Sequence, residues 1–147
     1  MAKRRTPPSL AEAQSRIRAA GLRSTVPRVA VLEQLRRAPT PLSHAEIYSH
    51  LAALGFDRAT LYRNLIDLTE AGLVTRTDLG DHVWRFELRA NGGKQTNEHP
   101  HFVCTDCGEV SCLPGVSVRI TRASGAPRAL RREAVEVQLK GICDRCD

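Results

Sequence analysis

Two pairs of cysteines in the C-terminal third constrain the fold of this chain more than any other feature. Cys104 and Cys107 form one C-x-x-C pair, Cys143 and Cys146 form a second, and residues 108–142 separate them. A C-x-x-C turn directs two thiolates at one metal ion, and two such turns complete the tetrahedral geometry of Zn²⁺. A single pair would also fit a thioredoxin-like redox motif, whereas two pairs favour a structural zinc site without an open coordination position.

Composition and charge are consistent with a small protein that binds a polyanion. The 147 residues suffice for one ordinary domain or two small ones, and only 4% of them are aromatic, so a small domain would gain folding energy from a metal. Residues 1–80 carry 12 Lys and Arg against 7 Asp and Glu, a net charge of +5 (12 − 7) out of +6 for the whole chain. A basic half is typical of nucleic-acid binding, although it also fits a basic surface that only confers solubility.

Nothing in the sequence indicates a membrane protein or a secreted one. No apolar run reaches the roughly 20 residues that span a membrane, and the N-terminus lacks the apolar core of a signal peptide. We therefore expect a soluble, cytoplasmic protein, and in that compartment paired cysteines are more often metal ligands than disulfides.

The N-terminal half has the periodicity of amphipathic helices. We expect helices over residues 9–21, 27–37, 43–54 and 58–71. Capping boxes open the first at Ser9 with Glu12 and the third at Ser43 with Glu46. The expected apolar stripes are Ile47, Leu51 and Leu54 in the third helix, and Leu61, Leu65 and Leu68 in the fourth.

The third and fourth helices, joined by a turn over residues 55–57, form a helix-turn-helix arrangement. With its leucines buried, the fourth helix directs Thr60 and Arg63 outward and places Tyr62 on the flank. At the N-terminal end of a recognition helix, Arg63 would contact a guanine edge or a phosphate, and Tyr62 a thymine methyl group. A plain helical bundle with an exposed arginine would show the same helical pattern.

A hairpin after the fourth helix favours the DNA-binding interpretation. Strands are expected over residues 73–78 and 82–88, with Trp84, Phe86 and Leu88 on one face and a turn over residues 79–81. A hairpin in this position is the wing of a winged helix. The predicted fold is α+β: a winged-helix domain over residues 1–90, a hinge over 91–97, and a small zinc-stabilised α/β domain over 98–147.

A second metal site is predicted just before the first cysteine pair. His99 and His101 would point the same way in an extended segment, so both imidazoles can bind one ion. Two imidazoles need further ligands, and Glu87 is the nearest plausible carboxylate because it faces away from the apolar side of its strand. Further candidates are Glu98, Cys112, His82 and His44. Two surface histidines would show the same pattern, and Cys112 also fits the role of a small buried hydrophobic residue or of a redox-sensitive thiol.

These motifs together resemble the ferric uptake regulator family over about residues 15–147. The segments that carry the resemblance are Ala20–Arg23, Pro27–Arg28, Ala59–Arg63, Glu70–Val74, Arg85–Glu87, His99-x-His101-x-x-Cys104-x-x-Cys107 and Gly141-Ile142-Cys143-x-x-Cys146. The order and spacing of the segments are more specific than any one of them.

The resemblance implies a homodimer that binds an AT-rich palindromic operator when it is loaded with metal and represses transcription. It places the four paired cysteines at the structural zinc site, and Glu87, His99 and His101 at a regulatory site for a divalent metal (Zn²⁺, Fe²⁺ or Mn²⁺) that bridges the two domains. The expected DNA-binding residues are Arg23, Arg28, Arg58, Thr60, Tyr62 and Arg63.

Three departures from the family pattern bear on the signal and on the dimer. Pro41 stands where the family often has a histidine, Cys112 replaces an acidic ligand, and Val135 replaces the histidine usually found eight residues before the third zinc cysteine. A thiolate in or near the regulatory site favours zinc, so zinc sensing is the first interpretation and iron or peroxide sensing the alternative. The segment over residues 113–133, which should carry the dimerisation helix, is short.

Two functions outside the family are alternatives to this interpretation. An enzyme would need an open metal position with a general base, or an activated nucleophile, and neither an H-E-x-x-H helix nor a nucleophile elbow is present. A zinc-stabilised protein-interaction module remains the main rival outside the family.

Overall fold

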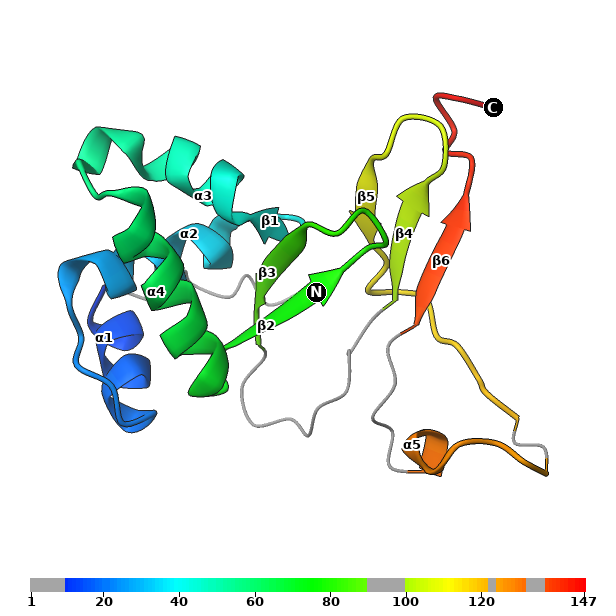
Figure 1. The fold of residues 1–147 in the computed structure, drawn as a ribbon, viewed down its shortest axis with the longest axis horizontal. Coiled ribbons are helices and arrows are strands. Elements are labelled where there is room, and N and C mark those ends of the chain that lie inside the picture. The colour runs from blue at the N-terminus through cyan, green and yellow to red at the C-terminus, as the bar shows by residue number, and fades with distance from the viewer. Residues whose placement is uncertain (1–9, 90–99, 122–123, 132–136) are drawn as a thin grey trace, which may run out of the picture. The chain divides into compact units, whose positions relative to one another are not determined.

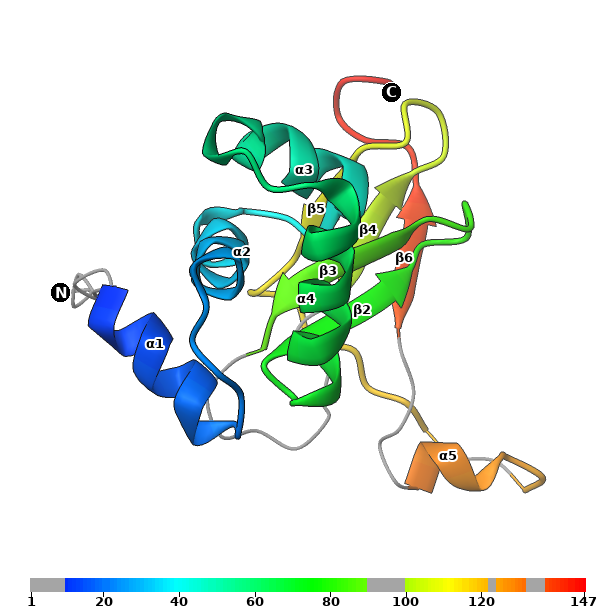
Figure 2. The ribbon, with the colours of Figure 1, turned by 60° about the vertical axis from the view of Figure 1, so that its left-hand side comes forward.

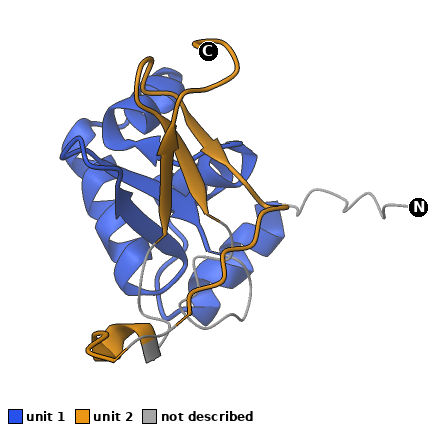
Figure 3. Ribbon diagram, turned by 90° about the vertical axis from the view of Figure 1, so that its right-hand side faces the viewer, with its two compact units in different colours: residues 1–90 blue, residues 91–147 orange. Residues whose placement is uncertain are grey.

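The computed structural model describes residues 10–89, 100–121, 124–131 and 137–147. The chain divides into two compact units, residues 1–90 and residues 91–147 (Figure 3). The expected hinge over residues 91–97 and the capping serine Ser9 lie outside the described residues. None of the helices in the described part of the chain is long and apolar enough to cross a membrane.

The helices of the first unit follow the sequence pattern closely (Figure 1). They are α1 (Leu10–Ala19), α2 (Val26–Arg37), α3 (His44–Leu51), the 3₁₀ helix η1 (Ala52–Leu54) and α4 (Arg58–Glu70). The capping box predicted at α3 is present: the hydroxyl of Ser43 accepts from the Glu46 backbone N–H at 3.2 Å, and the Glu46 carboxylate accepts from the Ser43 backbone N–H at 2.7 Å. Helix α4 is followed by Gly72 with a φ of +77°, as the sequence predicted for the residue after its end.

The third helix ends earlier than expected, and the prediction for Leu54 was wrong. Helix α3 stops at Leu51, and the next three residues wind as the tighter η1, which changes the direction in which side chains project. As a result Leu54 is 57% exposed, whereas Ile47 and Leu51 are buried.

The hairpin forms with one additional strand. Sheet A has the order β1-β3-β2 and consists of β1 (Leu42–Ser43), β2 (Val74–Asp78) and β3 (Trp84–Leu88), all antiparallel to their neighbours. Strand β1, which the sequence did not predict, pairs Leu42 with Phe86. Strand β3 begins two residues later than expected, because His82 adopts a left-handed φ of 60° in the turn.

The apolar face expected on β3 is only partly buried. Phe86 is 1% exposed, but Trp84 is 45% exposed near the end of the hairpin. The guanidinium of Arg76 lies 4.4 Å from the centre of the Trp84 ring and covers one of its faces. The indole therefore lies on the surface of the wing and not in the core.

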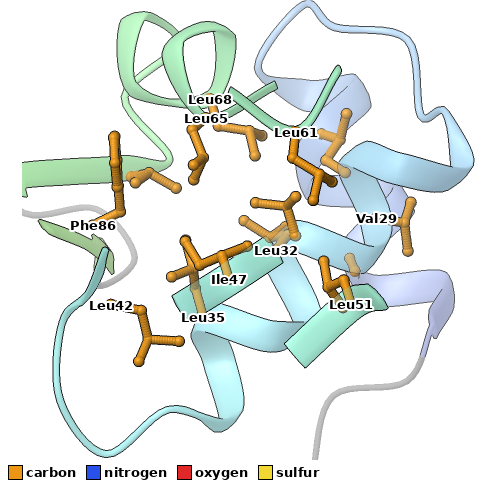
Figure 4. Packing of buried hydrophobic residues seen from close by; sticks show 14 residues of the cluster. Val29, Leu32, Leu35, Leu42, Ile47, Leu51, Leu61, Leu65, Leu68 and Phe86 are labelled. Atoms are coloured by element: carbon orange, nitrogen blue, oxygen red, sulfur yellow. The ribbon is translucent and has the colours of Figure 1, made fainter. Parts of the chain in front are cut away.

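The core of the first unit lies between the helices and sheet A. Figure 4 shows Leu61, Leu65 and Leu68 of α4 facing Leu32 and Leu35 of α2. Helices α2, α3 and α4 contact one another, as Figure 2 also shows, and α2, α3 and α4 each contact a strand of the sheet. Burial of an aliphatic side chain contributes roughly 1.5–3 kcal/mol, so this cluster holds the outer face of α4 in a defined orientation.

The second unit has a small sheet and few buried side chains. Sheet B has the order β5-β4-β6, in which β4 (His101–Cys104) is antiparallel to β5 (Val110–Cys112) and parallel to β6 (Gln138–Gly141). Helix α5 (Arg128–Arg131) is the one helix among its described residues. Of those residues, only Pro100, His101 and Cys104 are buried.

Candidate metal centre and nucleic-acid interface

The parallel pairing of β4 and β6 brings the two cysteine pairs together. Cys104 ends β4 opposite Gly141, so the turns that follow the two strands lie at the same end of sheet B. The ligand atoms of Cys104, Cys107, Cys143 and Cys146 all lie within 4.8 Å of one another. The sulfurs of Cys107 and Cys143 are 3.8 Å apart. Four sulfurs at about 2.3 Å from one ion are about 3.8 Å apart in a tetrahedron, so the cluster fits Zn²⁺.

The electrostatics of the cluster also favour a cation. Backbone N–H groups, first that of Cys107 and then that of Cys143, lower the pKa of the buried Cys104 thiol to about 6. The neighbouring thiols of Cys143 and Cys107 raise the pKa of Cys146 to about 12. One thiolate is therefore favoured by the backbone, and the accumulation of further negative charge requires a positive ion among the sulfurs.

Contacts around the cluster hold the two turns to each other. The backbone N–H of Thr105 donates to the carbonyl of Gly141 at 2.8 Å, and the backbone N–H of Cys143 donates to the sulfur of Cys104 at 3.4 Å. An ion pair joins Glu109 on one side to Arg145 on the other. These contacts join the two turns that carry the cysteine pairs.

A second pair of ligand-type side chains lies within sheet B. His101 on β4 is directly opposite Cys112 on β5, and their ligand atoms are within 4.8 Å of each other. Directly opposite residues of antiparallel strands project from the same face. His101 is buried and Cys112 is half-buried, so this cysteine is not the fully buried hydrophobic residue considered above. His99 and Glu98 lie outside the described residues.

The other ligand candidates lie in the first unit. Glu87 is half-buried on β3 opposite Thr75, on the face away from Phe86. His82 is in the turn of the wing with its side chain 96% exposed, 3.9 Å from Asp78. His44, at the start of α3, hydrogen-bonds to a backbone carbonyl, and among the described residues neither His82 nor His44 belongs to a cluster of metal-ligating side chains.

The outer face of α4 is positioned by its N-terminal cap as well as by its buried leucines. The carboxylate of Asp57 accepts from the backbone N–H of Thr60 at 2.8 Å and from its hydroxyl at 2.8 Å. These bonds, that to the backbone N–H first, lower the pKa of Asp57. Arg63 is exposed, and Tyr62 is 43% exposed.

Three arginines predicted to bind DNA have different surroundings. The exposed guanidinium of Arg58 lies 4.5 Å from the centre of the Tyr48 ring. Arg28 forms an ion pair with Asp67 of α4 and donates to the carbonyl of Arg23 at 3.0 Å, with its side chain 16% exposed. Arg28 therefore ties α2 to α4, while Arg23 and Arg58 remain exposed.

Two contacts, that of His101 with Cys112 and that of His44 with α4, could not be predicted from residue spacing alone. The pairing of His101 with Cys112 depends on the register of sheet B, and the position of His44 against α4 depends on the angle between two helices. Only the spacing of His101 and Cys112 on either side of a turn offered a signal for the first contact.

A helix-turn-helix with a wing, followed by a unit with a four-thiol metal cluster, defines a DNA-binding regulator that carries metal. The model of the ferric uptake regulator family matches residues 19–122 of this chain. The ferric uptake regulation protein of Shigella flexneri is 34% identical over 135 residues, covering 89% of this chain and 88% of that protein. Transcriptional regulator FurA of Mycobacterium bovis is 35% identical over 146 residues, covering 94% and 92%.

A solved structure agrees with these sequence matches. The Vibrio cholerae ferric uptake regulator superposes with a TM-score of 0.63 and 29% identity, covering 88% of this chain and 98% of that one. The chain belongs to the ferric uptake regulator family. It is a metal-responsive, DNA-binding transcriptional regulator and not an enzyme, and the predicted family and α+β fold are confirmed.

Proposed function

We propose that this chain is a homodimeric repressor that binds an AT-rich palindromic operator when a divalent metal, with zinc favoured, occupies a regulatory site. The observation that carries the zinc preference is the placement of the Cys112 thiol directly opposite His101. Thiolate ligands select Zn²⁺ over Fe²⁺ and Mn²⁺, which prefer oxygen and nitrogen donors.

The four-cysteine cluster is proposed to hold a structural Zn²⁺, separate from the regulatory metal. The distance between the sulfurs of Cys107 and Cys143 matches tetrahedral coordination, all four sulfurs lie within 4.8 Å of one another, and four thiolates leave no position for an exchanging ligand. Bound zinc there would hold the two turns of the second unit together at all times and would not act as the signal.

The regulatory metal is proposed to bind Glu87, His99 and His101, with Cys112 as a further ligand. The metal can change DNA affinity only if it binds the DNA-competent conformation more tightly than it binds other conformations. Coupling of ordinary size is roughly 1–3 kcal/mol, which corresponds to about 5- to 150-fold in DNA affinity.

The operator is proposed to be bound by the outer face of α4, with Arg63 and Tyr62 contacting bases. Both side chains are exposed near the N-terminal end of this helix, where a recognition helix enters the major groove. Arg23, Arg58 and Thr60 would contact the DNA backbone, and Arg28 would act mainly through its ion pair with Asp67.

Iron sensing is the second candidate for the signal. It is favoured by the relative from Shigella flexneri, which is named a ferric uptake regulation protein and aligns with most of this chain. A peroxide sensor would use the same iron-loaded site and would be recognised by the gain of one oxygen atom in the mass of a ligand histidine.

The test is DNA affinity in buffered Zn²⁺, Fe²⁺ and Mn²⁺, with duplexes selected from a random library by the wild-type protein. Zinc should stimulate binding at the lowest free concentration, and Cys112→Ser should shift the preference toward Fe²⁺ or Mn²⁺. The double variant His99→Ala, His101→Ala should lose stimulation while keeping about one tightly bound zinc per chain. His50→Ala, which removes an exposed imidazole from α3, is the matched control. A double variant that still responds to metal would refute the regulatory site.

A further inference from the structure

His44 contacts the recognition helix α4 at two points. Its Nε2 lies 2.9 Å from the carbonyl oxygen of Arg58. Its ring centre is 5.4 Å from the ring centre of Tyr62, with an angle of 63° between the planes, which is an edge-to-face arrangement. Figure 2 shows α3 and α4 as neighbours in the first unit.

Both contacts act on the same turn of α4. Arg58 and Tyr62 are four residues apart, so the carbonyl of the first lies one helical turn before the side chain of the second. A carbonyl only accepts hydrogen bonds, so Nε2 of His44 carries the proton that is donated. The imidazole is thereby oriented by the backbone, and its ring restricts the orientation of the Tyr62 phenol.

The same side of α3 supports a second side chain of this turn. Tyr48 follows His44 by one helical turn, and the Arg58 guanidinium lies over the Tyr48 ring at 4.5 Å from its centre. The side chains of His44 and Tyr48 therefore both border the N-terminal turn of α4. Tyr62 still has 43% of its surface exposed, which leaves part of the ring available to a ligand.

We propose that His44 is a positioning residue for DNA recognition and not a metal ligand: it holds Tyr62 in the orientation that contacts DNA. This inference rests on the proposed role of Tyr62 at the operator. Coordination of a metal through Nε2 would break the bond to Arg58. Immobilising a side chain before binding reduces the entropy that binding loses, so the free protein is preorganised for its operator.

The test is a double-mutant cycle between His44 and Tyr62, measured as affinity for a duplex selected from a random library by the zinc-loaded wild-type protein. His44→Ala should weaken binding about 3- to 10-fold, which is the size expected when one more side chain has to be ordered on binding. In the presence of Tyr62→Ala, the His44→Ala change should cost less than twofold, because the side chain that it positions is gone. His50→Ala, on the same helix, should leave affinity unchanged.

Two conservative variants separate the contacts of His44. His44→Phe keeps the ring edge and should retain most of the affinity, whereas His44→Gln keeps only the donor and should bind nearly as weakly as His44→Ala. All variants should bind the same number of metal ions per chain as the wild type. His44→Phe also provides the comparison if His44→Ala unfolds the first unit.

Three results would overturn the positioning role. The first is a His44→Ala variant that binds DNA with wild-type affinity. The second is a His44→Ala substitution that lowers DNA affinity by the same factor with and without Tyr62. The third is a His44→Phe variant that binds one metal ion fewer per chain. A Tyr62→Ala variant with unchanged affinity would instead refute the proposed function at α4, so the two failures are distinguishable.

Discussion

Replacing Cys104 with serine is expected to unfold the second unit while the first unit stays folded. Cys104 is 1% exposed at the end of β4, and its sulfur accepts the backbone N–H of Cys143. Serine is nearly isosteric, but its hydroxyl is a poor zinc ligand. The substitution therefore tests coordination with little change in packing.

The magnitude follows from how little else stabilises this unit. Apart from Cys104 itself, only Pro100 and His101 are buried among its described residues. A fully buried aliphatic side chain contributes roughly 1.5–3 kcal/mol, and a structural zinc about 10–16 kcal/mol in apparent binding free energy. Whole domains are stable by only about 5–15 kcal/mol. The binding free energy lost when zinc binds weakly is therefore larger than the free energy that apolar burial contributes in this unit.

Hydrogen exchange measured by mass spectrometry separates the two units in one experiment. In Cys104→Ser or after chelation, the amides of β4 and β6 should lose protection, and bound zinc should fall below one per chain. The amides of α2 and α4 should keep their protection. Cys112→Ser is the matched control, because it removes a thiol from the same sheet outside the cluster, and it should retain the structural zinc. Unchanged protection in β4 and β6 after zinc removal would refute this account of the second unit.

Three further changes test other parts of the molecule. Arg63→Ala should cost about 1–3 kcal/mol of operator affinity if the residue contacts a base, measured by fluorescence anisotropy, and an unchanged affinity would assign recognition to another element. Phe86→Ala should lower the free energy of unfolding by about 3–5 kcal/mol in urea, because this ring is buried opposite Leu42, and a loss below about 1 kcal/mol would contradict the packing described. Arg85 lowers the pKa of Asp81 from 3.8 to about 2, so this ion pair should stabilise the wing fully above about pH 4 and progressively less as the pH falls toward 2. NMR of the wing should show that dependence, and its persistence in Asp81→Asn would exclude this carboxylate as the cause.

Local features of the fold were predictable because the interactions that form them join residues close in sequence. The capping box of Ser43 with Glu46 starts α3 through bonds across three residues, and the spacing of the leucines in α4 defines its buried face. Leu54 is the exception: it was expected on the buried face of the third helix, but a turn of 3₁₀ helix replaces the α-helical geometry there.

The candidate metal cluster was predictable in its composition but not in its geometry. The spacing of Cys104 with Cys107 and of Cys143 with Cys146 indicates zinc chemistry, since each pair needs only one turn to direct two thiolates at an ion. The approach of the two pairs depends on the parallel register of β4 with β6, which joins residues far apart in the chain.

By itself the sequence determined the family, the helices and the chemistry of the paired cysteines, because short-range hydrogen bonds and residue spacing carry that information. Only the tertiary structure decided that Leu42 pairs with Phe86, that Cys112 faces His101, and that His44 supports Tyr62. These contacts depend on strand register and on the angles between helices. Both are decided by how the whole core packs, a property that no single segment encodes.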